Sequence, residues 1–202
     1  MAVAATTELE AINIMLAAIG EAPINSLTDT LPVDARTAQN TLTEVNKEVQ
    51  SEGWSFNTEI DVTLTRDGSN QINLPTNVLR VDANIHQHPT IDPIQRGLKL
   101  YDRQNNKYEF DDDLICTVVY FRDFNEITEQ ARRYINIKAA RIFVDRLIGD
   151  QGLRTYTQED ETRARAILTE SDYANADHNL LRGDPSLTNI FDTYNPSSAL
   201  IR

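Results

Sequence analysis

The segment TELEAINIMLAAIG, residues 7–20, and the segment VQSEGWSFN, residues 49–57, decide the fold of this chain. In the first segment, Thr7 and Glu10 have the spacing of a reciprocal capping box, and apolar residues follow at helical intervals. Gly20 stands where a left-handed C-terminal cap is expected. The pattern predicts that the first segment is a capped helix.

A second helix is predicted to end within the second segment. Asp34 is its predicted N-cap after Pro32, and Gly53 ends it before Trp54. One apolar stripe runs along this helix and consists of Ala35, Ala38, Leu42, Val45 and Val49. Because the loop between the two helices contains Pro23 and Pro32, neither helix is expected to extend through it.

Short words in these segments match the pattern of a known family. In the N-terminal part they are Ala11-Ile12-Asn13, Met15-Leu16, Ile19-Gly20-Glu21 with Pro23, Val49-Gln50 and Gly53-Trp54-Ser55-Phe56-Asn57. In the C-terminal part they are Tyr120-Phe121-Arg122-Asp123-Phe124, Glu126-Ile127, residues 131–134, Lys138-Ala139-Ala140-Arg141 and Asp172-Tyr173-Ala174. In these words the chain resembles the tail tubular protein A family, the head-to-tail adaptors of short-tailed phages. The resemblance covers most of the chain outside residues 60–115 and the tail after Leu181.

The resemblance implies a structural virion protein that is not an enzyme and holds no cofactor. Members of this family form a twelve-copy ring beneath the portal protein and above a tail nozzle protein of the tail tubular protein B type. The ring would provide a channel through which DNA passes as a passenger. Such a chain would assemble in the host cytoplasm and stay in the virion as part of the head-tail connector.

Composition agrees with a protein that does not grip nucleic acid. The chain of 202 residues carries a formal net charge of −12, and binding through phosphates depends on clustered Lys and Arg. An acidic channel lining would let DNA slide without sticky contacts, although acidity also serves solubility alone. We expect no membrane span, because no apolar run approaches about eighteen residues, and no secretion signal. The single cysteine, Cys116, is expected to be an inert core residue.

The middle third of the chain has the alternation of an antiparallel β-lobe. A first hairpin is predicted from Ile60, Val62 and Leu64 through the turn 66–69 to Ile72 and Leu74. The other predicted elements are a strand at 78–81, a loop at 86–97, a second hairpin between 98–102 and 107–110, and a strand at 114–121.

Helical spacing returns after the lobe, with helices predicted at about 128–148 and 158–175. The predicted fold class is therefore α+β. A four-helix bundle, residues 1–57 and 122–180, carries an inserted antiparallel β-lobe, residues 58–121, and an extended C-terminal arm, residues 181–202.

Two surfaces are predicted to serve assembly. The third helix is expected to expose basic side chains that meet an acidic surface on the next copy; these residues are Arg132, Arg133 and Arg141 on one side and Glu159, Asp160 and Glu161 on the other. The C-terminal arm is either a strap over its own helices or a segment that docks on the portal, and the family resemblance favours docking. Its anchors would be Leu187, Ile190, Phe191 and Tyr194. We assign the β-lobe to contacts with the nozzle.

Catalytic and metal sites have little support in the sequence. His86 and His88, with Asp92, have strand spacing for a metal site, but Pro89 favours a solvated loop. The acidic run 111–113 lacks the rest of a calcium loop and is predicted to be a charged turn. The alternative function is a carbohydrate hydrolase for capsule that uses an unidentified carboxylate pair. A monomeric binding module is a third possibility, which stoichiometry would separate from the ring.

Overall fold

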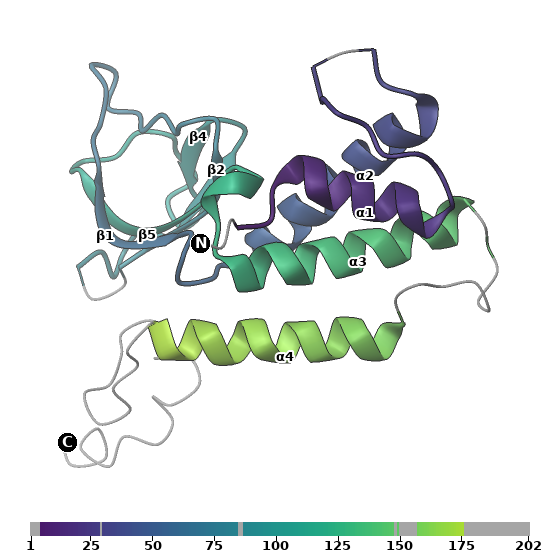
Figure 1. Cartoon of the computed structure of the whole chain (residues 1–202). Coiled ribbons are helices and arrows are strands. Elements are labelled where there is room, and N and C mark those ends of the chain that lie inside the picture. The colour runs from purple at the N-terminus through teal and green to yellow at the C-terminus, as the bar shows by residue number, and fades with distance from the viewer. Residues whose placement is uncertain (1–4, 29, 85–86, 148, 150–156, 176–202) are drawn as a thin grey trace.

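The computed structural model describes residues 5–28, 30–84, 87–147, 149 and 157–175, and it has an α+β fold (Figure 1). The helices are α1 (Glu8–Ala18), α2 (Val33–Ser51), α3 (Glu129–Leu147) and α4 (Gln158–Asn175), with a short 3-10 turn at Phe124–Glu126. The strands are β1 (Thr58–Leu64), β2 (Val78–Ala83), β3 (Pro93–Arg96), β4 (Lys99–Asp102) and β5 (Leu114–Tyr120). The predicted fold class is confirmed, with the strands inserted between α2 and α3.

Helix α1 begins as its sequence predicts. The Thr7 Oγ1 accepts a hydrogen bond from the Glu10 backbone N at 3.2 Å, and the Thr7 N–H donates to Glu10 Oε2 at 2.8 Å. This reciprocal pair satisfies two N–H groups that a helix end leaves without partners. Gly20 follows the helix with a φ of +82°, a left-handed conformation that favours glycine.

Helix α2 begins differently from the prediction. Pro32 occupies the N-cap with no side-chain hydrogen bond, so the predicted N-cap at Asp34 is wrong. Pro32 is extended, with φ −51° and ψ 155°, and its carbonyl already accepts the Arg36 N–H at 3.0 Å. The chain therefore enters the helix at Val33, and Asp34 lies in the first turn, where its charge suits the helix dipole.

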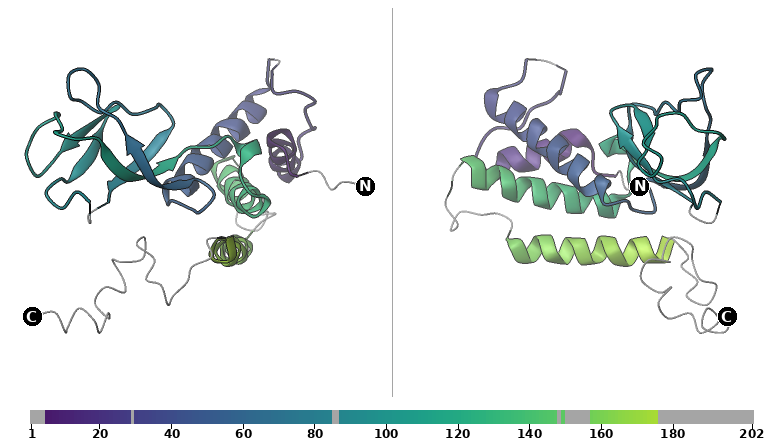
Figure 2. Two further views of the ribbon diagram at one scale, coloured as in Figure 1. Left: turned by 90° about the vertical axis from the view of Figure 1, so that its left-hand side faces the viewer. Right: turned by 180° about the vertical axis from the view of Figure 1, so that it is seen from behind.

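The helices pack around α3, which contacts each of the other three. Helices α1 and α2 cover one side of α3 and α4 lies along its opposite side (Figures 1 and 2). The predicted α2 stripe is fully buried in this core. Helix α4 contributes less, because only Ala164 and Leu168 of its side chains are buried. Three helices thus form the main core, and the fourth is attached to it.

The β-lobe contains a three-stranded sheet of order β1-β5-β2 and the two-stranded pair β3-β4 (Figure 1). One predicted strand pairing and one predicted loop are wrong. β1 pairs with β5 and not with residues 72–74, which lie beside the start of β4, where the Leu74 N–H donates to Leu98 O. The expected loop at 86–97 contains β3, which forms a hairpin with β4 through the two-residue turn Gly97-Leu98.

The strand β5 is the central strand of the three-stranded sheet. Both its neighbours pair antiparallel to it, and it contributes four residues to the core of the lobe or its border. That core consists of Leu64, Ile72, Leu74, Val78, Val81, Leu100, Phe110, Leu114, Cys116 and Val118. The alternation predicted for β1 is interrupted by a register shift between Glu59 and Val62, where Asp61 has a φ of 57°. This irregularity leaves Ile60 56% exposed.

A buried joint fixes the lobe to the helices. The Asn57 side chain accepts the Trp54 N–H at 2.9 Å and donates to the carbonyls of Gln50 and Tyr120, both at 2.9 Å. The Gln50 side chain in turn pairs with the backbone N–H and carbonyl of Arg122, both at 2.8 Å. The chain passes from the helices to the lobe between Gln50 and Asn57 and returns between Tyr120 and Arg122. The side-chain amides of Gln50 and Asn57 therefore hold these two connections together.

The same joint needs a glycine. Gly53 has a φ of +83°, and a Cβ at this position would lie 2.7 Å from Arg80 Nη2 and 3.2 Å from a Val119 methyl. Any other residue would be strained here by the positive φ, and its Cβ would crowd the Arg80 guanidinium and the Val119 methyl group. Gly53 thus ends α2 and also lets β2 and β5 pack close to the end of this helix.

Candidate assembly interface

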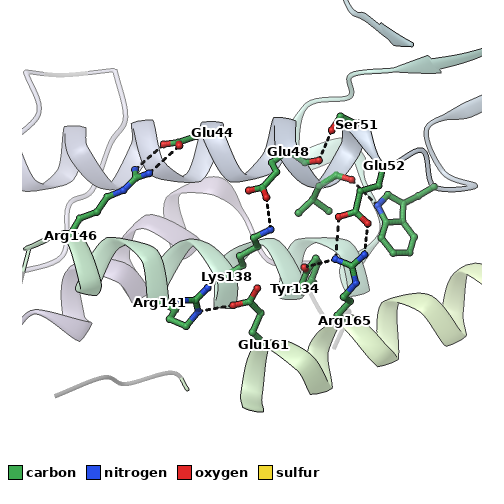
Figure 3. A network of polar contacts seen from close by, with 12 residues as sticks. Glu44, Glu48, Ser51, Glu52, Tyr134, Lys138, Arg141, Arg146, Glu161 and Arg165 are labelled. Atoms are coloured by element: carbon green, nitrogen blue, oxygen red, sulfur yellow. Dashed lines mark hydrogen bonds and ion pairs between the residues drawn. The ribbon is translucent and has the colours of Figure 1, made fainter. Parts of the chain in front are cut away.

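The three long helices are connected by a row of ion pairs (Figure 3). Glu44 and Glu48 on α2 and Glu52 at its C-cap follow one another at four-residue intervals and therefore share a face. Their partners are Arg146 at 2.8 Å, Lys138 at 2.9 Å and Arg165 at 2.6 Å. The first two partners lie on α3 and the third lies on α4, so the row fastens α2 to both helices.

Arg165 is the point where three helices meet. Its guanidinium donates to both Glu52 oxygens, at 3.2 and 2.6 Å, and to the Tyr134 hydroxyl at 3.2 Å (Figure 3). The hydrogen bonds with Tyr134 and Glu52 raise the pKa of Arg165 above its ordinary value. Because the pair is half exposed, its main effect is to orient α4, and its net free energy is modest.

Arg141 makes within one chain the contact predicted between copies. Its Nε lies 2.6 Å from Glu161 Oε2 on α4, and its Nη1 lies 3.3 Å from Asp145 Oδ2. The side chains of Arg141 and Glu161 are only 22% and 16% exposed. These two residues are therefore brought together, and they fasten α4 to α3.

Arg132 was predicted to lie on the exposed face of its helix, and this prediction is wrong. The residue is 9% exposed, and its guanidinium donates to the carbonyls of Ile127 at 3.0 Å, Thr6 at 2.9 Å and Asn125 at 2.6 Å. It satisfies carbonyls where the chain turns into α3 and where the N-terminus passes beside it. Folding brings these carbonyls close to Arg132, and the helical spacing of the sequence alone does not predict that they are near.

The remaining predicted interface residues divide into two groups. The Asp160 carboxylate accepts the Thr157 N–H at 2.9 Å and its hydroxyl at 2.8 Å, and these bonds lower the pKa of Asp160. Asp160 is therefore a helix cap. Arg133 and Glu159 are exposed and form no ion pair within the described part of the chain. They stay candidates for a contact with another copy.

Among the described residues that the sequence singled out, the structure brings together no catalytic or metal site. The His88 Nε2 accepts the Ile115 N–H at 3.0 Å, and Asp92 pairs with Arg103 at 2.6 Å; His86 lies outside the described residues. In the acidic turn, Asp111 pairs with Lys107 at 3.1 Å. Among the described residues no group of three His, Cys, Asp or Glu is placed to hold a metal ion.

Two further expectations concern the cysteine and the arm. Cys116 is fully buried, and burial together with the charge of Asp82 raises the pKa of its thiol to about 12, as expected for an inert core residue. The predicted arm, with Leu187, Ile190, Phe191 and Tyr194, lies outside the described residues. None of the helices in the described part of the chain is long and apolar enough to cross a membrane.

Comparison with known proteins places this subunit in a class. The model of a family described as tail tubular protein matches residues 9–178. The tail tubular protein A of Klebsiella phage KP34 is 31% identical over 166 residues, which cover 81% of this chain and 86% of that protein. Such proteins are structural components of the phage tail, and the virion is therefore where this chain is found. The chain belongs to the tail tubular protein family.

Proposed function

We propose that this chain is the head-to-tail adaptor of its phage, a twelve-copy ring between the portal and the tail nozzle through which DNA passes. The observation that carries the proposal is the family match over residues 9–178, together with a relative that is named tail tubular protein A. In this proposal the chain has a structural role and no catalytic one. Its partners are further copies of itself, the portal protein and a nozzle protein.

The architecture supports a role as a ring subunit. A closed ring repeats one heterologous contact at a fixed angle, so each copy must be rigid and must present two different patches. The ion pairs from Glu44, Glu48 and Glu52 fasten the helices to each other, and the joint at Gln50 and Asn57 fixes the lobe. A subunit built in this way holds the angle between its two patches.

The charge of the chain supports a channel for DNA. The net charge of −12 repels the phosphate backbone on average, so DNA would slide past twelve copies without the counterion release that tight binding brings. DNA is therefore a passenger in this proposal. The nozzle would contact the β-lobe.

Arg133 and Glu159 form the part of the predicted interface that is free for a neighbour. Both side chains are exposed, whereas Arg132, Arg141 and Glu161 are engaged within their own chain. Charge reversal by Arg133→Glu should weaken ring formation at physiological salt. An unchanged ring in this variant would remove Arg133 from the interface.

The C-terminal arm is proposed to dock on the portal through Leu187, Ile190, Phe191 and Tyr194, because aromatic anchors dominate many interfaces. Deletion of residues 182–202 should abolish portal binding and leave the thermal unfolding of the body unchanged. Equal portal binding by the shortened chain would contradict the assignment.

The adaptor role is tested by sedimentation of the chain with portal rings of the same phage. The proposal predicts that the chain migrates with the portal at a ratio of one copy per portal subunit. If the two folded proteins sediment separately at every salt concentration, the adaptor role is wrong.

A further inference from the structure

The β3-β4 hairpin has an outward face that its own lobe does not use. Directly opposed residues in an antiparallel pair share a face, and the register pairs Ile94 with Tyr101 and Arg96 with Lys99. Their neighbours Gln95 and Leu100 point inward, and Leu100 is fully buried in the lobe. The outward face is therefore formed by Ile94, Arg96, Lys99 and Tyr101.

Exposed apolar groups surround this face. Ile94 is 41% exposed, Leu98 at the tip of the hairpin is 50% exposed, and Tyr108 is 37% exposed. The Tyr108 ring packs edge-on against Tyr101 at 4.9 Å, and the Arg96 guanidinium lies 3.5 Å from the centre of the Tyr101 ring. Stacking of this kind holds Arg96 in one orientation before any partner arrives.

The face is basic on an acidic protein. Residues 93–108 contain four basic side chains and one acidic one, whereas the whole chain carries a net charge of −12. Arg103 and Lys107 are already paired with Asp92 and Asp111. Arg96 forms no ion pair with a carboxylate within the described part of the chain, whereas the Lys99 Nζ donates to Gln71 at 2.8 Å and its charge helps to lower the pKa of Asp67. Arg96 is thus the cation of this face that is left for an acidic partner.

A complementary surface lies on the outer side of α4. A shallow groove there is lined by Thr162, Arg165, Ala166, Thr169, Glu170 and Tyr173. Tyr173 is 62% exposed, and the next residue to the groove, Ile167, is 41% exposed. Glu170 supplies an exposed carboxylate beside this apolar strip, while Arg165 is occupied by Glu52.

We propose that the outward face of the β3-β4 hairpin docks in the α4 groove of a neighbouring copy. Leu98 and Ile94 would cover Ala166 and Tyr173, and Arg96 would pair with Glu170. In one chain β4 lies on the side of the lobe away from α4 (Figure 1), so the contact joins two copies. It uses a different patch on each copy, as a ring requires, and it rests on the proposed ring function.

The chemistry favours a protein partner over nucleic acid. Binding to duplex DNA depends on clusters of Lys and Arg, whereas this face offers one unpaired cation, Arg96, among exposed Ile and Leu side chains. Tyr and Arg beside an apolar patch are typical of the centre of protein interfaces. A second copy supplies the carboxylate and the apolar strip together.

A charge swap tests the contact, with ring formation on portal rings as the readout and circular dichroism as the check of folding. Arg96→Glu and Glu170→Arg should each weaken ring formation by about tenfold, because each places like charges opposite each other. The double variant, which restores opposite charges, should recover wild-type assembly. Arg36→Glu, the same charge change at an exposed position of α2, is the matched control and should assemble normally.

The outcomes separate this proposal from the ring itself. If the wild-type ring forms and both single variants assemble like the Arg36→Glu control, the contact is wrong and the ring stands. If the double variant stays as impaired as the singles, the pairing of Arg96 with Glu170 is wrong. If Arg96→Glu leaves the ring intact but lowers binding to duplex DNA or to the nozzle, that partner occupies the face. If wild type forms no ring, both proposals fail.

Because Arg96→Glu also removes the stacking on Tyr101, a second variant protects the test from a folding defect. Leu98→Asp changes a half-exposed side chain at the tip of the hairpin and leaves the Arg96 and Tyr101 side chains in place. It should weaken ring formation to a similar degree without changing the unfolding temperature. Normal assembly by this variant would overturn the docking of the hairpin tip.

Discussion

Asn57 shows how one side chain joins two parts of the molecule. It is 1% exposed, and its amide makes three hydrogen bonds to backbone groups of α2, the following loop and β5. A buried amide must have such partners, because a polar group without them costs about 1–3 kcal/mol. The position of the lobe on the helices therefore depends on this residue and on Gln50 beside it.

Replacing Asn57 should destabilise the whole chain. Asn57→Ala removes the side-chain hydrogen bonds to the Trp54 N–H and the Tyr120 carbonyl, while the Gln50 carbonyl keeps the Gly53 N–H at 3.1 Å. We expect the free energy of unfolding to fall by about 3 kcal/mol. Urea denaturation followed by circular dichroism measures the change. Asn40→Ala, an exposed position on α2, is the control and should change stability by less than about 0.5 kcal/mol. If Asn57→Ala lowers the free energy of unfolding as little as the control does, the Asn57 hydrogen bonds do not stabilise the fold.

The Asp102 carboxyl should make the stability of the chain depend on pH in the acidic range. Burial would raise the pKa of its carboxyl, but hydrogen bonds from Asn105, Asp92 and Gln104 outweigh burial and hold the pKa below the ordinary value of 3.8. A carboxyl with a lowered pKa in the folded state stabilises the protein above the ordinary pKa and loses this contribution as the pH falls through its folded pKa. Asp102 is 1% exposed, so its partners are not replaced by water.

The Asp102→Asn variant should therefore be less stable than wild type at pH 7, by about 1–3 kcal/mol. The difference should shrink as the pH falls below 3.8, because the wild-type carboxyl then becomes neutral as well. Urea denaturation at several pH values between 7 and 3 measures this. Asp112→Asn, in the exposed acidic turn, is the matched control. A difference independent of pH would show that the charge of Asp102 has no role.

Helix α4 is the element with the weakest apolar attachment. Only Ala164 and Leu168 of its side chains are buried. Its other ties are polar: Arg165 to Glu52, Glu161 to Arg141, and Asp172, which accepts the Ser55 N–H at 2.8 Å. Segments with few buried contacts open locally at a lower free energy than the whole protein. Since α4 carries one of the two proposed docking patches, its attachment matters for assembly.

Leu168→Ala should release α4 while the rest of the fold stays intact. Removing this buried side chain costs about 2–5 kcal/mol, which is a large share of the attachment. Hydrogen exchange should become faster in residues 158–175 and stay unchanged in α3. Ile167→Ala, a neighbour that is 41% exposed, is the control and should leave exchange unchanged. Equal protection of α4 in both variants would show that other contacts hold the helix.

The sequence predicts helices better than it predicts the pairing of strands. The capping box at Thr7 and the glycines after α1 and α2 are local signals, and the structure confirms each of them. The pairing of β1 with β5 joins segments about fifty residues apart, so the nearest β-prone run was a misleading partner. The strand β3 lies within the predicted loop, because it has only four residues, begins at Pro93 and follows Pro89 closely.

The candidate interface was harder to predict for a related reason. A pattern of charges on a helix shows which residues are basic, but the partners of those residues depend on the packing of other elements. Arg132 is used by three carbonyls and Arg141 by Glu161 of the same chain. Arg133 keeps the exposure that the sequence predicts.

At the scale of the whole molecule, a rigid subunit presents patches of opposite character on different elements. The lobe carries basic and aromatic side chains on β3 and β4, and α4 carries an apolar groove with Glu170. The two parts are held by the joint at Asn57 and by the helix ion pairs. The proposed closed ring would use two such patches on each copy.

The most direct test of the adaptor role is single-particle electron microscopy of this chain mixed with the portal ring of the same phage. The account predicts a closed twelve-copy ring at one end of the portal, with the β3-β4 hairpin of each copy against α4 of the next. A portal that stays bare, when both proteins are folded and in excess, would contradict the adaptor role.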